Sequence, residues 1–178
     1  MLNIFPSSIY ISACRLIVYR DIDDKDSFID AHVRTRNLFS DNFGDSSSVT
    51  PDSTRKFLSQ FNADNDSRIL YGVYYRETLI GQYGLKLLQP NAVLLDNAMR
   101  FMAIGPRGIF FDIGKWMVSH VISTYRNTRI YISVAEDNTD AMKIHQYGSW
   151  VLTPAGEGDV ASINRSLRTF RFVSFASG

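Results

Sequence analysis

The chain has 178 residues, of which 45% are hydrophobic and 21% are charged. This composition is that of a globular protein and excludes the class of disordered, low-hydrophobicity chains, and the length suits one domain. Lys and Arg number 19 against 18 Asp and Glu, a net charge of +1, so no global field would attract nucleic acid or an anionic membrane. Any anionic ligand must then be held locally.

The single cysteine, Cys14, excludes an intramolecular disulfide and a CxxC metal site, and it suits the cytoplasm. Ile11–Cys14 (ISAC) has the form of a bacterial lipoprotein cleavage site, but no basic residue precedes Arg15 and a proline interrupts the apolar run. We therefore expect residues 1–14 to be a flexible leader and residues 15–178 to form one domain. No apolar run approaches the roughly 18 residues that a membrane span requires.

The first third of the chain predicts a strand and two helices. Arg15–Ile22 (RLIVYRDI) is rich in β-branched and aromatic residues, as strands are. From Asp26, apolar residues recur at helical spacing until the polar cluster that begins at Ser40. A second helix begins after Thr50, a predicted N-cap, with Pro51 at the first helical position.

The rest of the chain predicts a mixed sheet. Residues 67–104 contain three apolar runs separated by RET and QPN, breaks of hairpin length, so three antiparallel strands are expected. A helix with Asp112 as its N-cap follows, then a strand over Thr128–Ala135, a short helix over 137–148 and two final strands. This order predicts an α/β domain with a mixed, mostly antiparallel central sheet flanked by four helices.

The string Asp137–Trp150 (DNTDAMKIHQYGSW) is the most informative motif in the chain. It matches the pattern D-N-x-x-A-x-x-L-Y-x-x-x-G-F at its first conserved positions, with Ile144 for the leucine. His145 stands at the tyrosine position and Ser149 replaces the glycine. The pattern is that of the GNAT superfamily of acyl-CoA-dependent N-acetyltransferases, which the chain resembles over residues 15–175. The resemblance predicts a GNAT-like fold.

Two weaker strings agree with this resemblance. Ile80-Gly81 and Gly84-Leu85 fit the family's hairpin pattern G-x-x-I-G-x-x-G-L. Arg36-Asn37, near the end of the first helix, is similar to the W-R-N of family branches that acetylate amino sugars on nucleotide carriers or ribosomal protein N-termini. The resemblance therefore places Arg36 and Asn37 at the acceptor substrate.

The resemblance implies that acetyl-CoA docks between two parallel strands, with its pyrophosphate on amides that open the following helix. Such a helix end suits an anion because it presents unpaired N–H groups and the positive end of the helix dipole. The family's phosphate signature aligns only partly, with Gly114 as its last glycine and Asp112 in place of its first. We expect Asp112 to point away, because a carboxylate 4 Å from a phosphate charge costs roughly 4 kcal/mol.

The residues that the resemblance assigns to acetyl-CoA share the end of one strand, the next helix start and the last helix: Met102, Ile104, Arg107, Gly108, Asp112, Ile113, Gly114, Lys115 and Asn138. Two alternatives stay open. Gly105–Gly108 (GPRG) could be only a strand-to-helix turn, and Asn138 could act only as a helix cap.

His145 is expected to protonate the departing CoA sulfur, the role that the family gives to its tyrosine. An imidazolium with a pKa near 6.5 can give a proton to a thiolate whose thiol has a pKa near 8.5. Tyr147 is the reserve donor, and the alternative for His145 is a core residue. The sequence does not reveal a general base: Asp96 lies toward a strand end, and His32 is interpreted as an ordinary interior or surface histidine.

These observations predict acetyl transfer from acetyl-CoA to a primary amine by direct attack. A small molecule such as an amino sugar is the favoured acceptor, and a protein N-terminus is the alternative. A second hypothesis is a GNAT-shaped CoA-binding or regulatory module without catalysis, because the phosphate signature, the tyrosine and the final glycine are altered. No metal, nucleic acid or membrane partner is expected, and the oligomeric state is left open, with a homodimer as one option.

Overall fold

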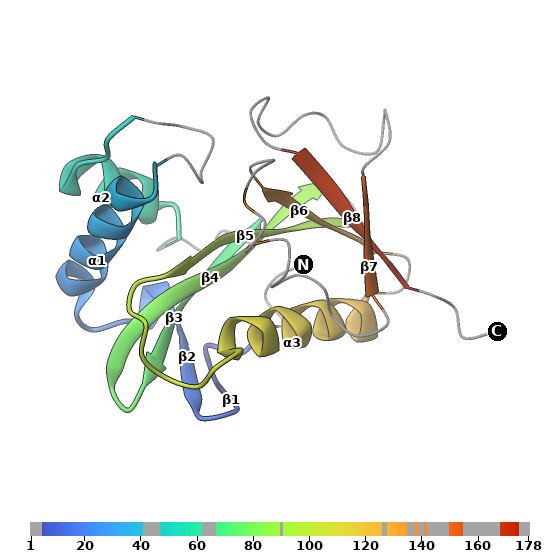
Figure 1. Ribbon diagram of the computed structural model, residues 1–178, viewed down its shortest axis with the longest axis horizontal. Coiled ribbons are helices and arrows are strands. Elements are labelled where there is room, and N and C mark those ends of the chain that lie inside the picture. The colour runs from blue at the N-terminus through green and yellow to red at the C-terminus, as the bar shows by residue number, and fades with distance from the viewer. Residues whose placement is uncertain are drawn as a thin grey trace.

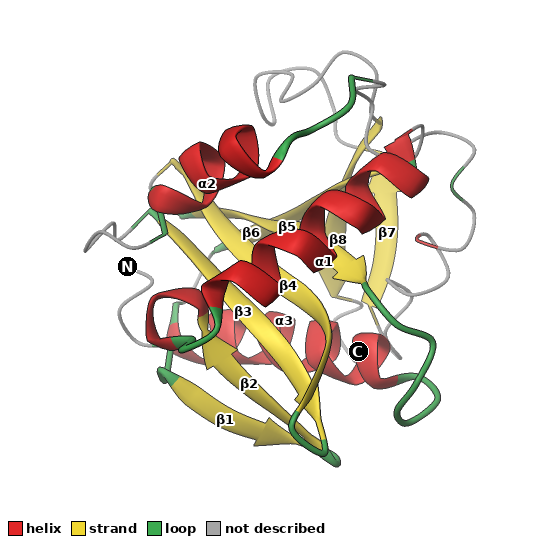
Figure 2. Cartoon of the chain, turned by 90° about the vertical axis from the view of Figure 1, so that its left-hand side faces the viewer, coloured by secondary structure: helices red, strands yellow, loops and turns green. Residues whose placement is uncertain are grey.

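The computed structural model describes residues 5–40, 47–61, 67–89, 91–125, 128–134, 138, 141, 150–154 and 168–174. One eight-stranded sheet runs through them in the order β1-β2-β3-β4-β5-β6-β8-β7. Helices α1 and α2 cover one face of the sheet and α3 lies against the other (Figure 1, Figure 2). The elements are β1 (Ser8–Ile11), β2 (Cys14–Val18), the 3-10 helix η2 (Tyr19–Asp21), α1 (Lys25–Leu38), α2 (Pro51–Ser59), β3 (Arg68–Tyr75), β4 (Thr78–Gln89), β5 (Ala92–Arg100), α3 (Ile109–Thr124), β6 (Arg129–Val134), β7 (Trp150–Pro154) and β8 (Arg168–Ser174).

The predicted α/β domain with a mixed sheet is confirmed. The three strands predicted between residues 67 and 104 are β3, β4 and β5, which pair antiparallel, whereas β5 and β6 pair in parallel. The described residues contain three α-helices, and the predicted fourth, over 137–148, lies outside them apart from Asn138 and Ala141. Among the described residues, no helix has the length and apolar character to cross a membrane.

The assignment of residues 1–14 to a flexible leader is wrong for Ser8–Ile11, which form β1 and pair antiparallel with β2. Phe5 is also buried, and its ring packs edge-on against Trp116 of α3 at 5.8 Å between centroids. The strand predicted over 15–22 ends earlier, at Val18, because the chain then turns into η2 and buries the Tyr19 ring. The apolar residues of the N-terminus are therefore part of the core.

The side chains of β3 alternate between two cores. Ile69, Tyr71 and Val73 are buried on the α3 side of the sheet. Leu70 is buried on the opposite side, among residues of α1 and α2 such as Phe28. Because successive side chains of a strand point to opposite faces, this continuous apolar run is what a strand covered on both faces requires.

Helices α1 and α2 both begin at side-chain caps. The carboxylate of Asp24 accepts a hydrogen bond from the Ser27 amide at 2.9 Å. At α2 the predicted N-cap Thr50 and the predicted Pro51 at the helix start are confirmed. Thr50 Oγ1 accepts a bond from the Ser53 amide at 3.2 Å, and Ser53 Oγ accepts one from the Thr50 amide at 2.9 Å. Such bonds satisfy amides that the helix leaves unpaired.

Gly81 of β4 determines how closely α3 packs on the sheet. A Cβ at this position would collide with the carbonyl oxygen of Met99 in β5 and with the ring of Phe110 in the first turn of α3. The absence of a side chain therefore lets the start of α3 pack directly over the pairing of β4 with β5. One of the glycines in the predicted hairpin motif thus has a steric reason.

Replacing Gly81 with alanine should lower the free energy of unfolding by about 3 kcal/mol, because the added methyl group overpacks a site bounded partly by backbone. Urea unfolding monitored by circular dichroism measures this loss. Ser119→Ala, at an exposed position of α3, is the control and should stay within about 0.5 kcal/mol of the wild type. A Gly81→Ala protein as stable as the control would show that α3 does not rest on this glycine.

Candidate functional site

Strands β5 and β6 run in parallel and then stop pairing. Their register ends at Leu95 opposite Ile132, although both strands continue. Immediately past this point β5 contains a bulge, in which Asn97 and Ala98 together stand opposite Tyr83 of β4. Asn97 has a φ of 54°, in the left-handed region that asparagine tolerates better than most residues. The bulge bends β5 and changes the direction of its side chains.

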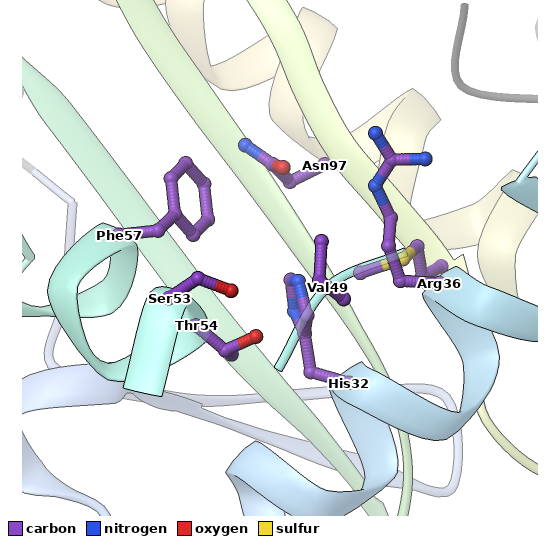
Figure 3. Close-up of a pocket in the computed structure, with 8 residues that line it drawn as sticks. His32, Arg36, Val49, Ser53, Thr54, Phe57 and Asn97 are labelled. Carbon is purple, nitrogen blue, oxygen red and sulfur yellow. The ribbon is translucent and has the colours of Figure 1, made fainter. Parts of the chain in front are cut away.

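A pocket of ≈ 250 Å³ lies beside this bulge, on the face of the sheet that α1 and α2 cover (Figure 3). Its walls come from α1, from α2 with the residue that precedes its cap, and from β5. The described residues that line it are His32, Arg36, Val49, Ser53, Thr54, Phe57, Asn97 and Met99. Because Asn97 and Met99 lie just past the last β5–β6 pair, the pocket adjoins the place where these strands part.

A buried hydrogen-bond chain connects α1 to β4 and β5. His32 is 5% exposed and Gln82 is fully buried. The distance between His32 Nδ1 and Gln82 Oε1 is 2.9 Å, and Gln82 Nε2 donates to the backbone carbonyl of Asn97 at 3.1 Å. Burial lowers the pKa of His32; the bond to Gln82 opposes this shift and the charge of Arg36 adds to it. The imidazole is therefore neutral near pH 7.

Two hydrogen bonds from the Asn37 side chain connect the end of α1 to the segment before α2. Its Nδ2 donates to the Val49 carbonyl at 2.9 Å, and its Oδ1 accepts from the Val49 amide at 2.8 Å. Both polar groups of the side chain are thus used on the backbone of a residue that lines the pocket. The geometry gives Asn37 the task of positioning a pocket wall, whereas Arg36 lines the pocket directly.

The hydroxyl groups of α2 differ in how they are satisfied. Ser53 Oγ donates to the Thr50 carbonyl at 3.0 Å and accepts from the Thr50 amide, so it is occupied by the cap. Thr54 is 2% exposed, and its Oγ1 has no hydrogen-bond partner among the described residues. A buried hydroxyl without a partner is uncommon in proteins. The Thr54 hydroxyl therefore lies at the pocket wall without a partner among the described residues, with its oxygen shielded from solvent.

Helix α3 starts without a side-chain cap, in contrast to α1 and α2. Its N-cap is Gly108, in the left-handed conformation with φ 81°, and a Cβ there would meet nothing within 4 Å. Arg107 beside it is exposed, and Lys115 is exposed two turns into the helix. A helix start with cationic neighbours suits an anion, since the helix dipole is positive at that end. The Ile109 amide at this start donates to the Pro106 carbonyl at 3.4 Å.

Several solved N-acetyltransferases share this architecture. The microcin C7 self-immunity acetyltransferase MccE, in complex with acetyl-CoA and AMP, matches with a TM-score of 0.74 and 12% identity over 98% of this chain and 100% of that one. RimL, the ribosomal L7/L12 α-N-protein acetyltransferase, matches with a TM-score of 0.71 and 10% identity over 93% of this chain and 92% of that one. Spermidine N-acetyltransferase from Vibrio cholerae, in complex with CoA and spermine, matches with a TM-score of 0.64 and 14% identity over 90% of this chain and 94% of that one. The chain has the GNAT fold.

No protein-family model and no curated protein matches the sequence. At identities of 10–14% the likeness to the solved structures is one of fold. The resemblance that the sequence carries is thus confirmed at the level of the fold. What this chain binds must be argued from its own residues.

Within this GNAT fold, four of the residues assigned to acetyl-CoA lie in the loop between β5 and α3. Met102 and Ile104 expose 41% and 43% of their surface, and their carbonyls accept hydrogen bonds from the Arg100 guanidinium at 3.0 and 3.1 Å. Arg107 and Gly108 complete the loop and open α3. The arginine at the end of β5 therefore fixes the path of this loop.

The prediction that Asp112 caps α3 is wrong. The helix begins at Ile109, three residues earlier, because Ile109 and Phe110 are themselves buried against the sheet. Asp112 lies in the first turn, and its carboxylate accepts a bond from the Ser12 hydroxyl at 3.1 Å. The amides of Ile113 and Gly114 consequently fall inside the helix, where they bond to carbonyls one turn back. An anion would meet the amides that follow Gly108 instead.

The residues of the last predicted helix are only partly described. Asn138 Oδ1 accepts a hydrogen bond from the Ala141 amide at 3.0 Å, which is the geometry of a helix cap. His145 and Tyr147, the expected catalytic residues, lie outside the described residues. Asp96, a carboxylate that the sequence offers as a base, accepts a bond from the Asn97 amide at 3.0 Å and is not among the described residues that line the pocket.

His32, Gln82 and Thr54 are the pocket features that the sequence analysis did not select. Two signals point to them. His32 and Arg36 are four residues apart and so share one side of a helix. Gln82 is a polar residue inside a long apolar strand, where a buried amide needs a partner from another element.

The lowered pKa of His32 makes stability depend on pH. Between the folded pKa and the ordinary value near 6.5, the unfolded chain binds a proton that the folded chain does not, so stability falls as the pH drops below 6.5. The ceiling for one proton is about 1.4 kcal/mol per pH unit. We expect the loss of stability between pH 7.5 and 5.5, measured by urea unfolding, to be smaller in His32→Gln. Equal losses in both proteins would contradict the assignment.

Proposed function

We propose that the protein transfers an acetyl group from acetyl-CoA to a primary amine that enters the pocket beside His32. The observation that carries this proposal is the arrangement around β5. The pocket lies on the α1–α2 face at the point where β5 and β6 part, and the uncapped start of α3 follows from the same strand on the other face. Two substrates that enter from the two faces of the sheet can thus meet where β5 and β6 part, which supports the close approach that direct attack in a ternary complex requires.

The start of α3 fits the diphosphate of acetyl-CoA. Gly108 has no side chain that could occupy the first amides of the helix, and Arg107 adds a positive charge. Solved structures with the same fold hold CoA or acetyl-CoA. The exposed Met102 and Ile104 offer apolar surface to the pantetheine arm between the diphosphate and the parted strands, and Asn138 is a hydrogen-bonding partner for the amides of that arm.

The pocket suits a small acceptor. Its volume of ≈ 250 Å³ has room for a small-molecule amine or for the first residue of a peptide. In the transfer, the amine nitrogen forms a bond to the thioester carbon while the carbon–sulfur bond breaks. His145 then protonates the departing sulfur, with Tyr147 as the reserve donor. Protonation makes the sulfur a better leaving group and so lowers the barrier to breaking the carbon–sulfur bond.

Acetyl-CoA at a hundredfold excess over its dissociation constant should raise the free energy of unfolding by about 2.7 kcal/mol. Arg107→Glu should weaken this binding roughly tenfold, about 1.4 kcal/mol, because it places a negative charge beside the diphosphate. Lys56→Glu makes the same charge change on the opposite face of the sheet and is the control. Thermal shift titrations measure all three proteins. No stabilisation of the wild type by acetyl-CoA would refute the proposed site.

His145→Phe should lower kcat by roughly 10²–10⁴ and leave the affinity for acetyl-CoA unchanged, since proton donation acts on the leaving sulfur and not on binding. Thiol release from acetyl-CoA, with spermidine, glucosamine and a peptide with N-terminal serine as acceptors, provides the assay. Tyr147→Phe should keep its activity. If Tyr147→Phe loses activity and His145→Phe does not, the donor assignment is reversed. Acetyl-CoA binding without thiol release by the wild type would favour a non-catalytic CoA-binding module.

A further inference from the structure

His32 has a fixed orientation because its partner, Gln82, has one. The Asn97 carbonyl can only accept a hydrogen bond, so the Gln82 nitrogen must face it. Gln82 therefore turns its oxygen toward His32, and the 2.9 Å contact requires a proton on Nδ1 of the imidazole. In the neutral ring the remaining nitrogen, Nε2, then carries the lone pair.

The ring of His32 lines the pocket together with Thr54 and Val49, and its centroid is 5.9 Å from that of the Phe57 ring (Figure 3). Its Nδ1 edge is bonded to β4, so Nε2 is on the edge away from the sheet interior. The buried Thr54 hydroxyl has no partner among the described residues and comes from the α2 side of the same pocket. A lone pair that faces a pocket suits an ammonium or amine group, which donates hydrogen bonds.

We propose that Nε2 of His32 takes the proton from the acceptor's ammonium, that Gln82 positions the ring for this, and that the acceptor is a weakly basic primary amine such as a peptide α-amino group or an amino sugar. The inference rests on the proposed acetyl transfer. It assigns His32 the role of general base, whereas the sequence analysis favoured an ordinary interior or surface histidine.

The proton balance of the step is complete. His32 accepts one proton from the ammonium, and the freed nitrogen lone pair forms the bond to the thioester carbon. The carbon–sulfur bond breaks, and the sulfur leaves as a thiolate that becomes a thiol. His145 supplies the proton that converts the thiolate to the thiol and is reprotonated from solvent. The amide nitrogen loses its second proton to solvent, and His32 returns its own proton to solvent, so one proton is released per turnover.

The acidity of the acceptor's ammonium decides how readily a weak base such as His32 can deprotonate it. The base has a pKa below the ordinary 6.5, because of burial and the charge of Arg36. An α-amino group, with a pKa near 8, gives up its proton to such a base roughly two orders of magnitude more readily than an alkylammonium near 10.4. None of the described lining residues is acidic, so a polycation finds no carboxylate among them.

The charged groups around His32 make this chemistry testable by pH. Arg36, one turn further along α1, is the charge that acts on the ring. The other elements that line the pocket or bond the ring present uncharged groups: Thr54 and Phe57 from α2, Gln82 from β4, and Asn97 and Met99 from β5. The pKa that sets the acid limb of the kcat/KM profile should therefore be that of His32.

The test is the pH profile of kcat/KM for thiol release, with the serine peptide, glucosamine and spermidine as probes. We expect the first two to exceed spermidine at pH 7.5. His32→Gln should lower kcat/KM by roughly 10²–10⁴ with the affinity for acetyl-CoA intact and the acid limb lost, and imidazole should restore activity to His32→Ala. His120→Gln, on α3 at the other face, is the matched control and should keep the wild-type profile.

Arg36→Gln is the second variant, because it removes a half-buried charge without emptying the core. Loss of this charge raises the pKa of His32, so the acid limb should move to higher pH. A His32→Gln protein that folds and keeps the wild-type kcat/KM and the acid limb of its pH profile overturns the role of His32 and leaves the proposed acetyl transfer standing. Absence of thiol release by the wild type with all three amines overturns the transfer reaction and this inference with it.

Discussion

The side chain of Gln82 is the constraint on which the candidate site depends. It is fully buried between α1 and the sheet, where an unsatisfied amide would cost about 1–3 kcal/mol. Both of its polar ends are satisfied, one by His32 of α1 and one by the Asn97 carbonyl in the bulge of β5. The same two bonds link α1 to the bulge of β5 beside the pocket and determine which nitrogen of His32 carries a proton.

Strand β5 brings the two halves of the site together. On one face it contributes Asn97, from its bulge, and Met99 to the pocket. Its end then leads through the loop fixed by Arg100 to the uncapped start of α3 on the other face. Gly81 allows that helix to pack directly on the neighbouring strand. Strand β5 thus connects the pocket beside His32 on one face of the sheet to the uncapped start of α3 on the other, near the point where β5 and β6 stop pairing.

The sequence predicted the sheet well because hydrophobic alternation and turn residues are local signals, and Thr50-Pro51 marked a helix start because capping is local too. It misplaced the start of α3 because the burial of Ile109 and Phe110 outweighs the capping preference of Asp112, a tertiary effect. The pocket was not predictable, since His32, Gln82 and Asn97 meet across three separate elements. The roles of His145 and Tyr147 stay predictions.

The central claim is that acetyl-CoA and the acceptor meet where β5 leaves β6. A crystal structure of the protein with bound CoA tests it most directly. The account predicts the diphosphate on the amides that follow Gly108 and the sulfur in the gap past Leu95 and Ile132, facing the pocket that contains His32. CoA bound elsewhere, or that gap filled by the protein's own side chains, would contradict it.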